Sequence, residues 1–208
     1  MLIINEIFYS IQGESTHAGK PCVFIRLTGC HLRCAYCDTA YAFHDGKRMS
    51  IQDIIKEIQI FRCKLVEVTG GEPLLQEDVY PLMDTLIESG HKVLLETSGS
   101  IALEKINPKV IKIIDFKTPS SQMTTHNRWS TLEQLSTHDE IKFVISDRSD
   151  YEWARRVITQ HNLPDRCHQV LMSPTHDILD PGLLGQWITQ DALCAKLQIQ
   201  LHKYLKMR

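Results

Sequence analysis

The sequence has no long hydrophobic run, little net charge and no sign of a leader segment. None of its apolar stretches approaches the roughly 20 residues that a membrane-spanning helix needs. The formal net charge of −2 gives no general attraction to nucleic acid or to anionic membranes. The first residues, MLIINEIFYSIQGES, lack the basic start and the small-residue cleavage site of a signal peptide. We therefore expect a globular protein of the cytoplasm.

Cysteine, by contrast, is plentiful, with seven among 208 residues. An odd count in a cytoplasmic protein argues against a disulfide framework. Hydrophobic residues make up 43% of the chain and charged residues 23%, which is the balance of an ordinary folded protein. No linker, repeat or low-complexity tract divides the sequence, so we expect a single domain spanning residues 1–208.

Short apolar segments alternate with helical ones almost from end to end. Seven segments rich in Val, Ile and Leu have the pattern of mostly buried strands: residues 22–29, 65–71, 92–99, 110–117, 140–147, 168–174 and 197–205. Between or beside them we expect four helices, at residues 50–61, 79–90, 149–162 and 181–197. The polar, aperiodic stretch 118–130 is expected to be a loop with one short turn of helix.

Terminal signals support the first two helices. Ser50 and Asp53, three residues apart, resemble a capping box at the start of the first helix. Gly90 is expected to end the second helix. Pro81 must lie in the first turn of that helix, because further along it would kink the element.

The alternation predicts parallel strands joined by right-handed crossovers, with helices covering the sheet. About seven strands suit an α/β fold of the incomplete (β/α) barrel type or an open doubly wound sheet. In both folds the chemistry gathers at the carboxyl ends of the strands. Four unusual segments follow consecutive predicted strands, at residues 30–37, 70–73, 96–99 and 115–117. We expect these four segments to meet at one edge of the sheet.

The first of them holds Cys30, Cys34 and Cys37 in a CxxxCxxC pattern. Structural zinc would need a fourth ligand, which His31 or His44 could supply. A redox dithiol of two of the cysteines is a second alternative, against which the third cysteine argues. A [4Fe–4S] cluster needs no fourth protein ligand if a small molecule binds the remaining iron. The other thiols are explained as small hydrophobic residues: Cys22, Cys63, Cys167 and Cys194.

The cysteine pattern, with Tyr36 before its last cysteine and its place after the first strand of a β/α series, resembles the radical S-adenosylmethionine (SAM) superfamily. The resemblance implies that the open iron binds SAM and that one electron cleaves it to a 5′-deoxyadenosyl radical. Gly-Gly-Glu-Pro at 70–73 is similar to the superfamily segment that contacts the methionyl amino group. Residues 96–99 and 115–117 occupy strand ends where members hold the ribose and carboxylate.

Further segments resemble the 7-carboxy-7-deazaguanine synthase family: FYSIQGES, FIRLTGCHLRCAYCDT, TGGEP, ETSGS and HKYL, in matching order over nearly the whole chain. This resemblance implies a carbon–nitrogen lyase that converts 6-carboxy-5,6,7,8-tetrahydropterin to 7-carboxy-7-deazaguanine with release of ammonia, on the pathway to queuosine and other 7-deazapurines. It also implies Mg²⁺, regeneration of SAM, a flavodoxin or ferredoxin as electron donor, and a homodimer.

The same resemblance implies roles for individual residues. The three cysteines would hold the [4Fe–4S] cluster, and the Thr39 hydroxyl would bind Mg²⁺, a cation that prefers oxygen ligands. Residues implied to contact SAM are Tyr36, Asp38, Gly71, Asp115, Phe116, Lys117 and Ser173. Residues implied to contact the substrate are Ile11, Gln12, Gly13, Arg26, Thr69 and, through a terminal carboxylate, Arg208. A two-pronged bond from Arg26 to the substrate carboxylate suits the guanidinium group. No catalytic side chain is assigned beyond the radical held by the cofactor.

One position departs from the family pattern, because Ser15 stands where members usually have glycine. Two rival functions stay open at this point. A small radical activase acting on a glycine of a partner protein would share the cysteines, but it should lack the SIQGE segment. A zinc-stabilised binding module would purify colourless, whereas an iron–sulfur protein is brown.

Overall fold

The structure, a computed structural model, describes residues 1–207. Its described strands form one sheet in the order β3-β1-β2-β4-β5-β6-β7-β8-β9. They are β1 (Leu2–Ile11), β2 (Pro21–Leu27), β3 (Lys47–Met49), β4 (Leu65–Gly70), β5 (Lys92–Thr97), β6 (Ile111–Asp115), β7 (Glu140–Ile145), β8 (Gln169–Pro174) and β9 (Lys196–Leu197). From β2 to β9 neighbouring strands are parallel, whereas β1 runs antiparallel to β2 and β3.

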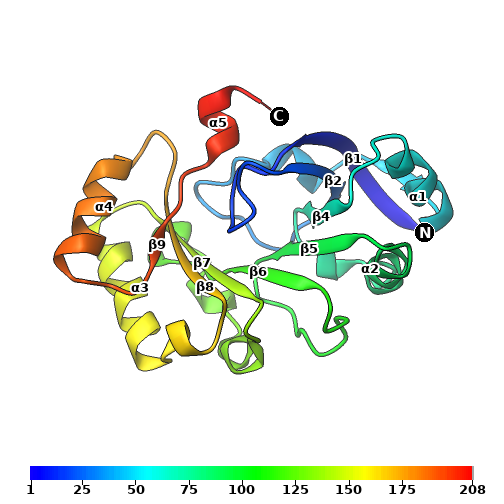
Figure 1. Cartoon of the computed structure of the whole chain (residues 1–208). Helices are drawn as coiled ribbons and strands as arrows, with labels where there is room; N and C mark the ends of the chain where they lie inside the picture. Colours follow the sequence, from blue (N-terminus) through cyan, green and yellow to red (C-terminus); the bar gives the residue numbers. More distant parts are fainter. Residues whose placement is uncertain (208) are drawn as a thin grey trace.

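Four helices cover the outer side of the curved sheet and a fifth lies apart from them (Figure 1). The helices are α1 (Ile51–Gln59), α2 (Val79–Glu88), α3 (Arg148–Gln160), α4 (Pro181–Gln190) and α5 (Leu201–Leu205). Figure 1 shows α1 beside β1, α2 beside β5, α3 and α4 beside β7 to β9, and α5 between these two ends of the sheet. Among the residues that the structure describes, no helix is long and apolar enough to cross a membrane.

Alternate residues of each strand face the helices and the inner side of the sheet, as the pleat of a strand requires. On β4, for example, Val66 and Val68 pack into the core beneath α1 and α2 with Ile54 and Leu82. The intervening Glu67 faces inward, as do Leu65 and Thr69, which lie two residues before and after it. The inner face is apolar only at its base, where a small cluster forms from Cys22, Phe24, Leu65, Leu94 and Ile113. Polar and charged side chains can therefore occupy the layers above this base.

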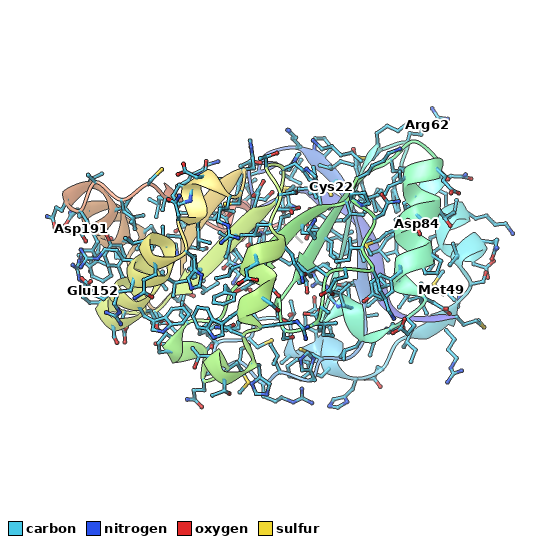
Figure 2. All side chains as sticks on the ribbon, turned by 90° about the horizontal axis from the view of Figure 1, so that it is seen from below. Cys22, Met49, Arg62, Asp84, Glu152 and Asp191 are labelled. Carbon is cyan, nitrogen blue, oxygen red and sulfur yellow. The ribbon has the colours of Figure 1, made fainter. Side chains whose placement is uncertain are left out.

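The residues at the ends of α1 and α2 have the conformations and contacts that the sequence predicts. The Ser50 hydroxyl accepts a hydrogen bond from the Asp53 amide at 3.1 Å and donates to its carboxylate at 2.7 Å. Pro81 is the third residue of α2, within its first turn. Gly90 follows the last residues of α2 with a φ of +78°, a conformation that glycine adopts without a steric penalty. Figure 2 places Asp84 of α2 and Glu152 of α3 toward opposite ends of the molecule.

Two strands were not expected from the alternating pattern. β1 and β3 extend the sheet with antiparallel pairs, so the described sheet has nine strands and not about seven. The expected loop at 118–130 contains three short 3-10 segments: η3 (Pro119–Ser121), η4 (Thr124–His126) and η5 (Trp129–Gln134). The remaining described 3-10 segments are η1 (Ala40–Phe43), η2 (Pro73–Leu75) and η6 (Leu163–Asp165).

The expectations for the last 30 residues were partly wrong. α4 ends at Gln190 and not near residue 197, because Ala192 takes a positive φ of +45°. Cys194 therefore lies beyond the helix, and it is exposed. The expected strand at 197–205 is confined to β9, and residues 201–205 form α5 instead. Contacts to the loop after β1, described below, draw this segment away from the sheet.

Candidate active site

A cavity of about 550 Å³ opens on the inner side of the sheet, at the carboxyl ends of its parallel strands. This volume lies within the range of small-molecule and cofactor sites. All four segments expected to meet there contribute to its wall. The predicted site residues that line it are Ile11, Gln12, Gly13, Arg26, Cys30, Cys34, Tyr36, Cys37, Asp38, Thr39, Thr69, Gly71, Asp115, Lys117 and Ser173. Arg208 lies outside the described residues.

Phe116 is the exception among the described residues. Its side chain is fully buried on the helix-covered side of the sheet, where its ring lies 6.2 Å from that of Trp153 and 6.1 Å from that of Phe143. Asp115 and Lys117 point into the cavity, so the residue between them faces the other way. The side chain of Phe116 therefore cannot contact a cofactor in the cavity, and only its backbone is available.

The cysteine loop is held between two other segments. The Ala35 amide donates to the Ser121 carbonyl at 3.1 Å, and the Cys37 amide donates to the Cys34 carbonyl at 3.1 Å. On the other side, a Cβ atom at Gly71 would collide with the Gly29 carbonyl. Glycine at this position thus lets the end of β4 pack directly against the start of the loop. Gly71 has a packing role beside the cofactor contact expected of it.

The thiols do not converge on one point. Among residues 1–207, no group of three or more His, Cys, Asp or Glu side chains could hold a single metal ion. Four ligands converging on one ion is what structural zinc requires, and His31 is engaged elsewhere, with its Nε2 atom 2.9 Å from the Ser100 hydroxyl. A [4Fe–4S] cluster takes each thiolate on a different iron, so three separated thiols in one cavity fit it. Burial raises the pKa of the Cys30 and Cys34 thiols, and coordination to a metal would deprotonate them.

Glu72 joins the Gly-Gly-Glu-Pro segment to the end of β5. Its fully buried carboxylate accepts hydrogen bonds from the Thr97 hydroxyl at 2.8 Å, the Ser98 amide at 2.8 Å and the Ser98 hydroxyl at 2.5 Å. A fourth donor is the Leu74 amide at 3.2 Å. Four donors satisfy a buried carboxylate that forms no salt bridge within residues 1–207. Residues 70–73 and 96–99 therefore form one rigid part of the rim.

Asp115 offers an unused acceptor to the cavity. Its Oδ2 atom lies 3.0 Å from the Lys117 ammonium, whereas its Oδ1 atom is buried without a hydrogen-bond partner among the described residues. Burial lowers the pKa of Lys117, but Asp115, Cys34 and Tyr36 together outweigh it and the pKa is raised overall. A buried acceptor without a partner is costly, and a hydroxyl or amino donor of SAM would satisfy it. The residues present thus fit the cofactor that the cysteines imply.

Lys142 of β7 is the centre of a buried group of charges. Its ammonium lies 2.8 Å from Glu14 Oε2, 2.5 Å from Glu96 Oε1 and 3.7 Å from Asp115 Oδ2. Burial opposes ionisation of Glu14, yet Lys142 holds its pKa at about 2. Burial raises the pKa of Glu96 to about 8, because nearby Glu14 adds to the effect and Lys142 only partly offsets it. The cavity therefore contains one carboxyl whose pKa Lys142 lowers and another whose pKa burial raises.

Arg26 lies on the opposite wall, on β2. Its Nε atom donates to Glu6 Oε1 at 2.8 Å, and its guanidinium lies 5.8 Å from the ring centres of both Phe8 and Tyr41. These contacts fix the plane of the guanidinium group. Thr69 is its register partner on β4. Glu6 holds the Nε atom, and the terminal nitrogens have the fork geometry that binds a planar anion.

Thr39 precedes η1 without capping it, because its side chain makes no hydrogen bond to the helix amides. Its hydroxyl instead lies 3.8 Å from the Cys37 sulfur, at the cavity wall. The neighbouring Asp38 accepts from Lys203 Nζ at 2.7 Å. Tyr36 lies with its hydroxyl 3.5 Å from that of Thr118.

The tail covers one side of the cavity through polar contacts. The Leu201 amide donates to the Gly13 carbonyl at 2.9 Å, and Gln200 Nε2 donates to Glu14 Oε1 at 2.9 Å. A side chain on Gly13 would collide with His202. Gly13 thus admits α5 as well as lining the expected substrate site.

Several cavity residues were missed by sequence reasoning. Among them are Glu14, Glu67, Lys142, Gln200, His202 and Lys203. Glu67 and Lys142 interrupt apolar strands, and a charge inside a buried strand is the signal that could have found them. The tail residues gave no such signal, because their role depends on where α5 packs.

Comparison with known proteins agrees with this geometry. Residues 24–115 match the Radical SAM superfamily. The 7-carboxy-7-deazaguanine synthase of Koribacter versatilis is 45% identical over 97% of this chain and 96% of its own. That of Chlorobaculum tepidum is 42% identical over 98% and 94%. The crystal structure of QueE from Escherichia coli is similar in fold, with a TM-score of 0.77 at 24% identity over 97% of this chain and 94% of that one. The fold is thus the mostly parallel partial barrel expected from the sequence.

Proposed function

The chain belongs to the 7-carboxy-7-deazaguanine synthase family of radical SAM enzymes, and on this premise we propose how its cavity residues carry out the reaction. The activity is that of a carbon–nitrogen lyase in queuosine biosynthesis, and the family implies a [4Fe–4S] cluster, SAM and a pterin substrate. The observation that supports our assignment of roles is the meeting of the cysteine loop, residues 70–73, Asp115 and Arg26 in one cavity.

Cys30, Cys34 and Cys37 would hold the cluster, which together with SAM supplies the adenosyl radical that starts the reaction. Gly71 and Asp115 would position SAM beside it, the latter through its unused Oδ1 atom. The chain's part is to orient two ligands and to keep water from the radical, as enzymes do with reactive intermediates. The buried rim held by Glu72 and the tail suits both tasks.

Arg26, Thr69 and residues 11–13 would bind 6-carboxy-5,6,7,8-tetrahydropterin on the other side of the cavity. The guanidinium would hold the substrate carboxylate with its terminal nitrogens, since Glu6 already fixes its Nε atom. Ammonia leaves in the reaction, and the leaving nitrogen takes up a proton. Glu96, whose pKa is about 8, holds a proton in the cavity at neutral pH.

Thr39 would be the protein ligand of Mg²⁺. Its hydroxyl lines the cavity and caps no helix. A hard cation takes oxygen ligands and keeps several waters, so one hydroxyl with a substrate carboxylate is a chemically suitable set. We also propose, from the family resemblance, a flavodoxin or ferredoxin as electron donor, a homodimer, a single domain and a cytoplasmic location.

The test is a reaction in the absence of oxygen with iron–sulfur-reconstituted protein, reductant, SAM, Mg²⁺ and carboxytetrahydropterin. We expect 7-carboxy-7-deazaguanine by mass spectrometry, with little net 5′-deoxyadenosine because SAM is regenerated. Formation of 5′-deoxyadenosine without the deazaguanine would contradict the pterin site and leave the radical chemistry standing. A glycyl radical activase would show that second outcome.

Cysteine variants give a test that does not depend on turnover. Cys34→Ala should lower bound iron and the brown absorbance after reconstitution, because one of three cluster ligands is lost. Cys63→Ala is the matched control, since Cys63 is half-buried outside the cavity and its sulfur only donates to backbone carbonyls. Equal iron content in the two variants would contradict the assignment of the cluster.

A further inference from the structure

Glu67 has a position in the cavity that neither the sequence nor the roles proposed above explain. It lies on β4 two residues before Thr69, on the same inner face and one layer deeper. Its register partner on β2 is Phe24, just as Arg26 is the partner of Thr69. Two residues along a strand span roughly 6–7 Å. A planar ligand held at Arg26 by one end therefore points its other end toward the level of Glu67.

The Glu67 carboxylate is buried without a cation. The residue is 6% exposed, and within residues 1–207 it forms no salt bridge. Its one described side-chain hydrogen bond comes from Gln12 Nε2 to its Oε2 atom. Glu14, Glu96 and Asp115 pair with Lys142, and Asp38 pairs with Lys203, so Glu67 differs from the other carboxylates that line the cavity. A buried carboxylate that is not compensated by the protein is costly, and a ligand with N–H donors would compensate it.

Charged groups from several elements face Glu67. Burial and the negative Glu14 raise the pKa of Glu67 to about 7, while Gln12, Lys142 and Arg26 act in the opposite direction. At neutral pH the carboxyl is therefore divided between its two protonation states when no ligand is bound. A ligand that donates to both oxygens would favour the ionised state and expel the proton.

We propose that Glu67 determines specificity for the 2-amino-4-oxopyrimidine edge of the substrate by accepting hydrogen bonds from its 2-amino group and the adjacent ring N–H. These two donors are parallel, and the two oxygens of one carboxylate match them as they match a guanidinium fork. Substrate and product share this edge, so the contact serves binding through the whole reaction. The inference rests on the pterin site proposed above. It adds the residue that binds the end of the substrate opposite its carboxylate.

The test compares pterin-6-carboxylate with lumazine-6-carboxylate, in which a carbonyl replaces the 2-amino group. Calorimetric titration of the iron–sulfur-reconstituted enzyme should show the pterin binding roughly 10- to 100-fold more tightly, which is the loss expected for a hydrogen bond to a charged group. In Glu67→Gln the amide can donate to the lumazine carbonyl and accept from the ring N–H. The preference should therefore fall to below twofold or reverse. Glu67→Asp keeps the carboxylate and should keep the direction of the wild-type preference.

Glu140→Gln is the matched control. Glu140 is another buried carboxylate, bonded to the Thr16 amide at 3.0 Å, and it does not line the cavity. This variant should retain the wild-type preference. If Glu67 only orients Gln12, Glu67→Gln would weaken both ligands equally and leave the preference unchanged, and that result would overturn the proposal.

Proton release gives a second readout, which can test the proposal on the wild type alone. Titrations in buffers of different ionisation enthalpy measure the number of protons released per ligand bound. For the wild type at pH 7, pterin binding should release a fraction of one proton, and in Glu67→Gln this fraction should be smaller. A wild type that binds both ligands equally, or that binds the pterin without releasing protons, would overturn the proposal. A wild type that binds neither ligand would show instead that the pterin site itself is wrong.

Discussion

The Lys142 ammonium of β7 and the Glu14 carboxylate of the loop after β1 form a buried ion pair, with Nζ 2.8 Å from Oε2. The pair joins residues 128 positions apart in the sequence. Glu14 is in turn the acceptor for Gln198 at 3.1 Å and for Gln200 at 2.9 Å. One charge pair thus connects the sheet, the loop after β1 and the tail around the cavity.

Lys142→Met should destabilise the fold strongly. The substitution keeps most of the length of the side chain but leaves Glu14 and Glu96 without their ammonium, and breaking a buried pair by removing one partner costs roughly 3–5 kcal/mol. Urea unfolding measures the loss. Lys105→Met is the control, because Lys105 pairs with Glu77 at the exposed surface, and losing an exposed ion pair should change the urea midpoint little. Similar losses in the two variants would contradict this account.

Thr39→Val should weaken the response to Mg²⁺ while leaving the fold intact. Valine has the shape of threonine without the hydroxyl, and the hydroxyl makes no capping bond whose loss would affect stability. The expected result is a rise of about tenfold or more in the Mg²⁺ concentration needed for half-maximal activity. Losing one residue that supports a bound metal typically has an effect of this size. Thr39→Ser, which keeps the oxygen, should respond nearly as the wild type does. A normal Mg²⁺ response in Thr39→Val would show that Thr39 is not a ligand of Mg²⁺.

His17 should make stability depend on pH between about 4 and 6.5. Burial, with Lys92 and Lys20 nearby, lowers the pKa of His17 to about 4. Below pH 6.5 the unfolded chain takes up a proton here that the folded chain refuses until about pH 4, so the free energy of unfolding falls as the pH falls through this window. Urea unfolding at a series of pH values should show a shallower slope for His17→Gln than for the wild type. Equal slopes in the two proteins would show that His17 does not contribute to the pH dependence of the free energy of unfolding.

Ser15→Gly should be more stable than Ser15→Ala by about 1 kcal/mol. Ser15 has a φ of +63°, a conformation that costs a residue with a Cβ roughly 1–2 kcal/mol and costs glycine little. Both variants lose the hydrogen bond from the His17 amide to the Ser15 hydroxyl at 3.0 Å, so this loss cancels in the comparison. Thermal unfolding of the two variants provides the measurement. The loop therefore has a backbone conformation that suits the glycine expected at this position from the resemblance, although serine occupies it.

The segments that meet at the carboxyl ends of the strands were predictable from the sequence, because their position depends only on the order of strands and helices along the chain. The alternation of apolar strands and helices places the segments after β2, β4, β5 and β6 at one edge of a parallel sheet, whatever the details of packing. Phe116 shows the limit of this reasoning. A motif identifies neighbours along the chain, but successive strand residues face opposite sides, and only two of the three residues in 115–117 reach the cavity with their side chains.

The tail and the buried charges were not predictable in the same way. Residues 197–205 alternate as a strand would, yet hydrogen bonds to Gly13 and Glu14 turn them into α5. Such contacts join distant segments, and periodicity contains no information about them. β1 and β3 were missed because their antiparallel pairing lies outside the β/α alternation. Lys142 was visible as a charge in an apolar strand, but its three partners come from separate elements.

The contact between Gly13 and His202 has a consequence for the order in which this protein is made. The ribosome synthesises the loop after β1 early, and the residues that complete the cavity wall against it, such as Gln200, come 186 positions after Glu14. During most of translation the Glu14 side chain and the cysteine loop lack this covering segment. The wall that Gln200 contributes to the cavity is thus completed only after the strands from β1 to β9 have been synthesised.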